Sequence, residues 1–459
     1  MNRIRGMRYS ALALASVSLA ALGGFAAAQI ADADGGVRAD ADLEFRIELD
    51  NGDPEFRTGI DLDLITATRE RRLSFSGDFG VVVPLDDIEA AEFDDPRYGV
   101  DYLRDTGRMQ LAIGADLRRR DIDDRTFEDP DAPFDEDALT VIEGGTEEQR
   151  AFDFNLALGA TDPLGVEISY SYDDRIYTDA ADPDLRDRIR QEAGLAFRLE
   201  ADQTLTFGMS TQWTLDDEDP GLGSQRDERV RAGADVMWQI RPDLEITAEL
   251  AYARSEVESE LAGGVLVIQD RDGLNMRFGL GLDRPNGGYR FDISRILHAP
   301  GFVGNVNLTR SFELPRGAEV SVSLGAANLP NGETYGTGAF TYDRDLRRGV
   351  VALSFTQDAT LNGAFDAVER RILEGSYRLD LPRDARIALS GRLTDSDFVD
   401  PAGTDLETAR LAVNYSRPLT ERWDIGAGAS WRLTREDGAD DRTDERVFFS
   451  LERRFSIRQ

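Results

Sequence analysis

Apolar and polar residues alternate strictly over long stretches of this chain. Between Trp423 and Leu433, every second residue is apolar, and the residues between them are small or charged. Because successive side chains of a strand point to opposite faces, this pattern predicts a two-faced β-strand, whereas a helix would scatter the same residues around its circumference. The pattern recurs at residues 43–49, 230–240, 244–252, 274–282 and 411–415.

The connections between these segments are short and long in turn. Short ones are expected at residues 162–164, 201–202, 241–242, 284–287, 382–384 and 417–420. Long ones, rich in Asp, Gly and Pro, are expected near residues 119–149, 174–188, 216–227, 256–271, 395–405 and 435–444. Short periplasmic turns and long outer loops are the layout of outer-membrane barrels. We therefore predict an all-β fold, a transmembrane antiparallel up-and-down β-barrel of about 18–22 strands. The strands near 97–104, 337–343 and 346–357 have the weakest pattern.

The N-terminus has the pattern of a secretory signal peptide. Three arginines precede an apolar run of small residues that ends at Phe25, and Ala26-Ala27-Ala28 fits an A-x-A cleavage site. A single N-terminal membrane anchor is the alternative, but the run is short for a spanning helix. We expect a cleaved signal peptide at residues 1–28 and a single barrel domain at residues 29–459, with no room for a periplasmic domain after Gln29.

Composition excludes several classes of protein. After residue 28 no run of eighteen apolar residues occurs, so a membrane-spanning chain would have to be a closed barrel. The chain has no cysteine, which excludes disulfides and thiolate metal sites. All 53 basic residues are arginine, which excludes a P-loop lysine and a Schiff-base lysine. The net charge of −35 argues against binding of nucleic acid.

The signal peptide, the alternating strands and the terminal segment 446–455 together resemble Gram-negative outer-membrane barrels, porins included. In that family the last strand ends in an aromatic residue that the barrel-assembly machinery reads. The resemblance implies that Phe455 is this assembly signal, although four further residues follow it here, of which Ile457 continues the alternation. It also implies the cell outer membrane as location, contact with lipid and lipopolysaccharide, and a homotrimer by analogy with porins.

If the apolar face meets lipid, the other face lines the lumen. About twenty strands enclose a lumen wide enough for water, and rings of both charge signs would suit a water-filled pore. The alternative is that these charges form salt bridges that only hold the wall in shape. The pore-lining candidates are Arg229, Arg231, Asp235, Glu245, Glu249, Arg277, Arg410 and Arg432.

The longest connection, residues 119–149, is strongly acidic. Twelve acidic residues lie between Asp121 and Glu148, against Arg125 alone. A loop folded into the lumen would narrow it and favour cations. The alternative is a solvated outer loop, bridged to lipopolysaccharide by Mg²⁺ or Ca²⁺. The constriction candidates are Asp121, Asp123, Asp124, Asp131, Asp135 and Glu136.

Catalytic signals are absent from the sequence. The one histidine, His298, is expected at a loop, and neither G-x-S-x-G nor H-E-x-x-H occurs. We therefore expect no enzymatic activity, no cofactor and no metal site. The expected function is a water-filled pore for passive diffusion of small hydrophilic solutes, with a preference for cations. The alternatives are an export or assembly barrel, for example for polysaccharide, and a closed structural or adhesive surface barrel.

Overall fold

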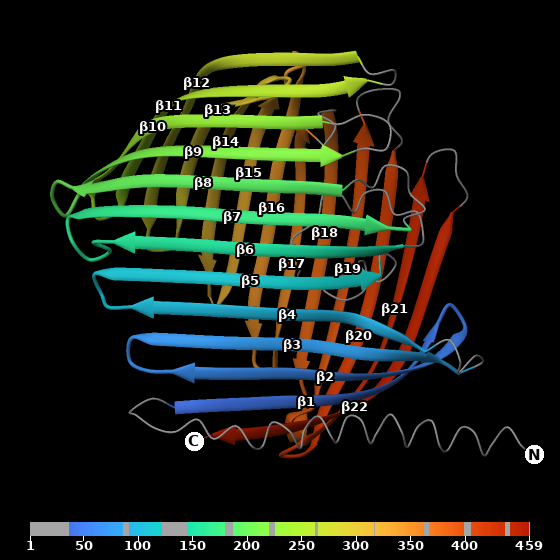
Figure 1. Ribbon diagram of the computed structural model, residues 1–459. Coiled ribbons are helices and arrows are strands. Elements are labelled where there is room, and N and C mark those ends of the chain that lie inside the picture. Colours follow the sequence, from blue (N-terminus) through green and yellow to red (C-terminus); the bar gives the residue numbers. More distant parts are fainter. Residues whose placement is uncertain are drawn as a thin grey trace, which may run out of the picture.

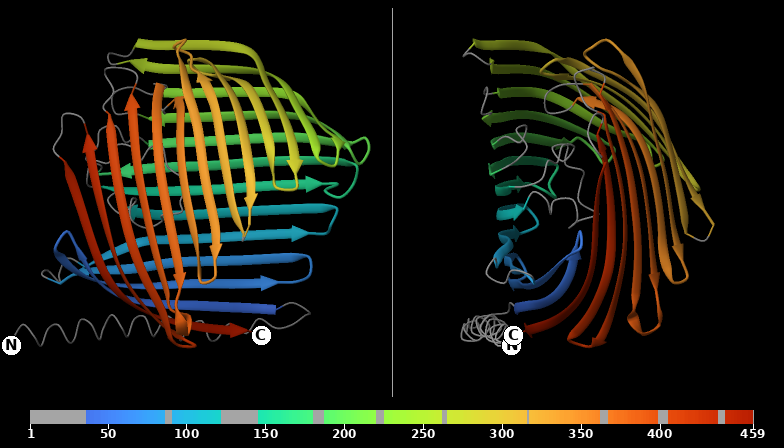
Figure 2. Two further views of the ribbon diagram at one scale, coloured as in Figure 1. Left: turned by 180° about the vertical axis from the view of Figure 1, so that it is seen from behind. Right: turned by 90° about the vertical axis from the view of Figure 1, so that its right-hand side faces the viewer.

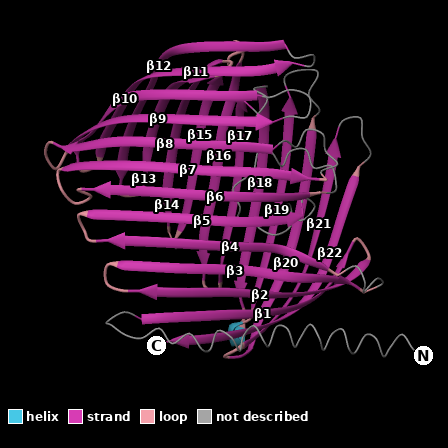
Figure 3. Cartoon of the chain, in the orientation of Figure 1, coloured by secondary structure: helices cyan, strands magenta, loops and turns pink. Residues whose placement is uncertain are grey.

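The computed structural model describes residues 36–85, 91–121, 145–179, 187–219, 225–261, 265–315, 317–361, 367–398, 405–436 and 441–458. They form 22 strands (Figure 3). The strands are β1 (Gly36–Asp50), β2 (Asp53–Ala67), β3 (Arg71–Pro84), β4 (Glu92–Asp105), β5 (Met109–Asp121), β6 (Thr146–Leu158), β7 (Leu164–Thr178), β8 (Asp187–Glu200), β9 (Leu205–Asp219), β10 (Gln225–Arg241), β11 (Leu244–Leu261), β12 (Val265–Arg284), β13 (Gly287–His298), β14 (Gly301–Leu314), β15 (Ala318–Asn328), β16 (Thr334–Leu346), β17 (Gly349–Leu361), β18 (Ala367–Asp380), β19 (Arg386–Phe398), β20 (Leu406–Thr420), β21 (Trp423–Glu436) and β22 (Arg442–Arg458). A single 3₁₀ turn, η4 (Pro382–Asp384), joins β18 to β19. Within these residues, no helix is long and apolar enough to cross a membrane.

The strands form one closed antiparallel barrel. Each strand pairs with its neighbours in sequence, and β1 pairs with β22 along the length of both (Figures 1 and 2). The connections after even-numbered strands up to β20 are short, and those after odd-numbered strands include all the long ones. We call these two ends of the barrel the turn end and the loop end. The start of β1 and the end of β22 both lie at the turn end, because their register pairs Arg38 with Arg458.

The predicted fold class is confirmed, and the strand number lies at the upper limit of the predicted range. All six strongly alternating segments lie within strands, and the three weak ones correspond to β4, β16 and β17. Two predicted connections are wrong. Residues 417–420 belong to β20 and the turn follows Thr420, and the long connection expected at residues 256–271 is confined to residues 262–264, because β11 and β12 extend into it. Proline is common in turns, but Pro418 instead lies at a register irregularity near the strand end, where it interrupts few ladder hydrogen bonds.

The barrel has an apolar outer face and a polar inner face instead of a large packed core. Leu250 on β11 and Leu411 on β20, for example, are 53% and 58% exposed, and their strand neighbours of opposite parity are polar or small. The largest cluster of buried apolar residues is small and lies at the loop end of β14, β15 and β17; it comprises Val303, Ala327, Leu329 and Ala359. An apolar band on the outside of a closed barrel is the surface that meets lipid, so the polar face lines the lumen.

Buried charges close the barrel where β1 meets β22. Glu48, which is fully buried, pairs with Arg46 on its own strand at 2.9 Å and with Arg446 on β22 at 2.7 Å. The Arg446 guanidinium also reaches Asp50 at 3.0 Å, and Arg46 stacks on the Phe448 ring at 3.9 Å. We call Arg46, Glu48, Asp50 and Arg446 the seam cluster. It joins residues from the two ends of the chain at the loop end of the barrel.

The hairpin between β12 and β13 depends on a glycine. Gly287 follows Pro285-Asn286 and has a φ of +116°, a conformation that side chains other than glycine rarely adopt. A Cβ here would also clash with the backbone oxygen of Ser311. We expect Gly287→Ala to lower the free energy of unfolding by roughly 2–3 kcal/mol, measured by urea unfolding of the refolded barrel in lipid vesicles. The control is Gly59→Ala, at a glycine with ordinary φ and open space around it, and equal losses in both variants would contradict this reading.

Candidate functional site: the charged inner wall

All eight predicted pore-lining residues lie on the inner face. They are distributed over β10, β11, β12, β20 and β21, and each except Arg229, which follows the outward Glu228, alternates with outward apolar or small neighbours. Four of them, Arg231, Asp235, Glu249 and Arg277, lie close together on β10–β12. Arg410 and Arg432 are register partners on β20 and β21. Glu245 stands apart, opposite Gly281 and without a carboxylate or guanidinium partner among the described residues. Their role in the passage of a solute stays a prediction.

The first group spans three neighbouring strands. Glu249 on β11 contacts the Arg231 guanidinium on β10 and lies 4.0 Å from Arg277 on β12. Asp235 is the register partner of Glu249. Its carboxylate lies over Gly208 on β9, in the space that a larger side chain at that position would occupy. The two arginines and two carboxylates balance in charge. This group therefore braces the wall and leaves no net charge for a solute.

The eighth candidate lies near the loop end. Arg229 on β10 contacts Asp227 on the same strand, and Ser255 on β11 donates a hydrogen bond to Asp227 at 3.2 Å. Asp227 and Ser255 are both buried. This arrangement is structural in character, because all of its charges are paired within the wall.

The second group is a row of arginines across adjacent strands. Arg392 on β19, Arg410 on β20 and Arg432 on β21 are successive register partners. The row ends on Glu374, 3.0 Å from Arg392, and on Asp444, 3.1 Å from Arg432. Arg432 and Asp444 are both buried. We call these five residues the arginine row.

A hollow of 490 Å³ opens beside the arginine row on the lumen side. Small residues form part of its lining, including Ser376, Ser390 and Gly391. Its charged and amide lining consists of Arg378, Arg392, Arg410, Asn414, Asp343 and Glu374. Guanidinium groups bind carboxylate, phosphate and other anionic oxygens in a bidentate manner, so the hollow suits an anionic group.

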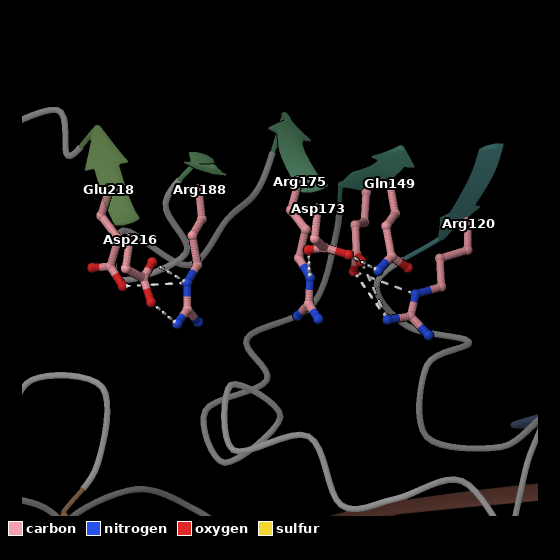
Figure 4. A network of polar contacts seen from close by, with 8 residues as sticks. Arg120, Gln149, Asp173, Arg175, Arg188, Asp216 and Glu218 are labelled. Atoms are coloured by element: carbon pink, nitrogen blue, oxygen red, sulfur yellow. Dashed lines mark hydrogen bonds and ion pairs between the residues drawn. The ribbon is translucent and has the colours of Figure 1, made fainter. Parts of the chain in front are cut away.

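Ion pairs also line the loop end of β5 to β9 (Figure 4). Arg120 contacts the buried Glu147 at 3.1 Å, Arg175 contacts Asp173 at 3.0 Å, and Arg188 contacts Asp216 at 2.5 Å. Gln149, on the same strand as Glu147, donates a hydrogen bond to Asp173 on β7. The labelled side chains all project from the same face of the wall. Arg120 lies near the end of β5 and Glu147 near the start of β6, on either side of the longest connection. Their ion pair therefore holds these two strands together where the connection begins and ends.

The constriction candidates are largely outside the described residues. Asp123, Asp124, Asp131, Asp135 and Glu136 fall in the stretch 122–144, and Asp121 is the last residue of β5, with its side chain not described. The predicted signal peptide lies outside the described residues too. Phe455 lies on β22 with its ring against Arg453 on the outer face. Its recognition by the assembly machinery stays a prediction.

Sequence analysis missed several charged residues of the inner wall. Glu48, Glu147 and Asp444 are buried at the loop end, yet no local pattern distinguishes them from the acidic loops beside them. The alternation of faces along each strand would have placed these three side chains on the inner face of the barrel. Only the cross-strand register shows which arginine each one contacts. Within the described residues, no group of three or more His, Asp or Glu side chains is arranged to hold a metal ion.

Comparison with known proteins shows the fold alone. No family model matches the chain, and no curated protein matches it. Among solved structures, the FrpB iron transporter from Neisseria meningitidis (F3-3 variant) matches with a TM-score of 0.60 and 9% identity, over 92% of this chain and 82% of that one. The siderophore receptor PirA from Acinetobacter baumannii matches with a TM-score of 0.60 and 7% identity, over 91% and 80%. The ferric-catecholate import receptor Fiu from E. coli K12 matches with 0.59 and 10%, over 92% and 82%.

The expectation of a passive diffusion pore of the porin type is wrong. The matched structures are an iron transporter and siderophore receptors, and 22 strands is the size of outer-membrane transporters, whereas porins have about 16–18. The outer-membrane location stands, since a closed barrel of this size with an apolar outer band belongs in the outer membrane of a Gram-negative bacterium.

Proposed function

We propose that this chain is a receptor-type transport barrel that takes up a bulky anionic metal chelate, of the ferric-siderophore class, across the outer membrane. The observation that carries the proposal is the arginine row beside an open hollow on the lumen side. The fold likeness to iron and siderophore receptors supports the class of solute, although function resides in the site and not in the fold.

The chemistry of the arginine row fits such a solute. A catecholate complex of Fe(III) presents several anionic oxygens on a rigid, rounded surface. Arg378, Arg392 and Arg410 line the hollow and can donate charge-assisted hydrogen bonds to such oxygens, and the small residues of the hollow leave space for part of the ligand. The first group, on β10–β12, is balanced in charge.

The width of the barrel fits it as well. With strands about 4.8 Å apart and tilted by roughly 40°, 22 strands give a diameter of roughly 40 Å between opposite backbones. A lumen of this width selects poorly by size. Recognition must therefore come from binding at the wall, as the arginine row provides.

Binding of a ferric catecholate tests the proposal. We expect the refolded chain to bind ferric enterobactin, and Arg392→Gln and Arg410→Gln each to weaken binding about tenfold to hundredfold, because each removes a charge-assisted hydrogen-bond donor. Isothermal titration calorimetry measures both. Arg290→Gln is the control, since Arg290 faces the lumen on β13, away from the hollow. Absence of binding by the wild type, to this chelate and to a ferric hydroxamate alike, would refute the function; an equal loss in the control would refute the site.

A further inference from the structure

The outer face carries arginines close to the turn end. We call six of them the turn-end arginines, and each lies within five residues of the turn-end limit of its strand: Arg71, Arg104, Arg310, Arg344, Arg417 and Arg453. Arg71 and Arg104 are register partners of each other, and the register partners of the other four are apolar or aromatic. For example, Arg344 is the register partner of Val351, and the next outward pair on the same two strands is Tyr342 with Leu353.

Aromatic rings accompany most of these arginines. Tyr102, Phe312, Tyr342, Tyr415 and Phe455 each lie two residues away from one of them, on the same face of the same strand. The Arg310 guanidinium lies 4.0 Å from the Tyr289 ring and 4.7 Å from Phe312. That of Arg453 lies 5.1 Å from Trp423 and 4.6 Å from Phe455. Aromatic girdles mark the height of the membrane–water interface in outer-membrane barrels.

No carboxylate offsets the charge of the turn-end arginines. Among the described residues, none of the six forms an ion pair, and no Asp or Glu occupies an outward position within five residues of the turn-end limit of a strand. The acidic residues nearby, such as Asp343, Glu313 and Glu452, have the opposite parity and face the lumen. A side chain on one face of the wall cannot neutralise a guanidinium on the other.

The loop end of the outer face differs in this respect. Five outward arginines there pair with carboxylates of the same face, among them Arg254 with Asp270 at 2.8 Å and Arg371 with Asp395 at 2.9 Å. The other three are Arg150, Arg226 and Arg435. Arg241 and Arg284, at the turn-end limits of β10 and β12, do contact a carboxylate, that of Asp243 in the turn after β10, at 3.3 Å and 3.9 Å. The six turn-end arginines have no such partner among the described residues, whereas the five arginines of the loop end are paired.

We propose that the turn-end arginines bind the phosphate groups of phospholipids in the adjoining leaflet and select an anionic phospholipid such as phosphatidylglycerol. The arginine stems lie along the apolar wall and carry the guanidinium to the interface, where bidentate contact with phosphate replaces the missing carboxylate. The turn end faces the periplasm in outer-membrane barrels. The inference does not depend on the solute proposed above.

Quenching of one tryptophan by brominated lipids tests this. Trp423 contacts Arg453, so a full-length variant with Trp213, Trp238 and Trp431 replaced by Phe reports on this site alone. In mixed vesicles, we expect brominated phosphatidylglycerol to associate about fivefold more strongly than brominated phosphatidylcholine, which corresponds to about 1 kcal/mol per arginine near a charged lipid surface. The preference should fall as salt is raised. A ratio near one in this parent variant overturns the proposal without any further substitution.

Two substitutions locate the effect. Arg453→Gln should bring the ratio near one, whereas Arg453→Lys should keep most of it, because the charge remains. The matched control is Arg435→Gln, at an outward arginine of the loop end that pairs with Asp441, and it should leave the ratio unchanged. If Arg435→Gln has the same effect as Arg453→Gln, or if neither lipid quenches Trp423 because a second copy of the chain covers it, the proposal is wrong.

Discussion

Replacing Glu48 with alanine is expected to lower the free energy of unfolding by about 3–5 kcal/mol. Glu48 is the shared partner of Arg446 and Arg46 at 2.7 Å and 2.9 Å, and both Glu48 and Arg446 are buried. Without the carboxylate, the buried guanidinium of Arg446 would lose its 2.7 Å ion pair. Because the cluster joins β1 to β22, the loss should also weaken closure. Urea unfolding of the refolded barrel, followed by tryptophan fluorescence, measures it.

Two further variants separate charge from packing. Asp42→Asn changes a carboxylate on the same face of β1 that meets Arg454 only at 4.0 Å and in an exposed setting, so its cost should stay below about 1 kcal/mol. The double variant Glu48→Leu with Arg446→Met should recover more than half of the loss, since apolar replacement of a buried ion pair is often neutral or stabilising. A cost for Glu48→Ala as small as that for Asp42→Asn would show that the seam cluster does not hold the barrel closed.

The sequence predicted the strands well because alternation is a local property. The segment 423–433 specifies two faces by its own residues, and a strand of that kind needs no knowledge of its partners. Turn and loop ends followed from connection length in the same way. Pro418 was misread because a proline near a strand end and a proline in a turn have the same sequence signature.

Register could not be predicted in this way. Arg392, Arg410 and Arg432 form a row only because the ladders of β19, β20 and β21 place them opposite one another, and a shift of two residues would preserve every face while separating them. Glu48 and Arg446 lie at opposite ends of the chain, so their pairing depends on closure itself. Parity is encoded locally, whereas register depends on the sum of many weak cross-strand contacts.

The prediction of a porin-type pore failed because the number of strands was predicted only as a range. A range of about 18–22 strands covers both the upper porins and the larger transporters, and the inner charges listed from sequence fit either. The distinguishing features are a complete count of strands and the arginines that several strands bring together around the hollow, and both require the assembled barrel.

Replacing Leu250 with arginine is expected to cost about 2–4 kcal/mol, because a charge on the lipid face near the bilayer midplane is strongly unfavourable. Leu250 is 53% exposed, and its register partners Ala234 and Met276 are apolar. It lies six residues from the turn-end start of β11, hence roughly 15 Å along the membrane normal, near the middle of the apolar band. Urea unfolding in vesicles measures the cost.

The control for this variant is Thr247→Arg, three residues away on the same strand. Thr247 is exposed on the inner face, opposite Gly279 and Met237, where an arginine would meet water and should change the free energy of unfolding by less than about 1 kcal/mol. The pair tests the assignment of faces directly. If Thr247→Arg were the costly variant, the faces would be inverted, the arginine row would point to lipid, and the proposed binding of an anionic chelate in the lumen would fail with it.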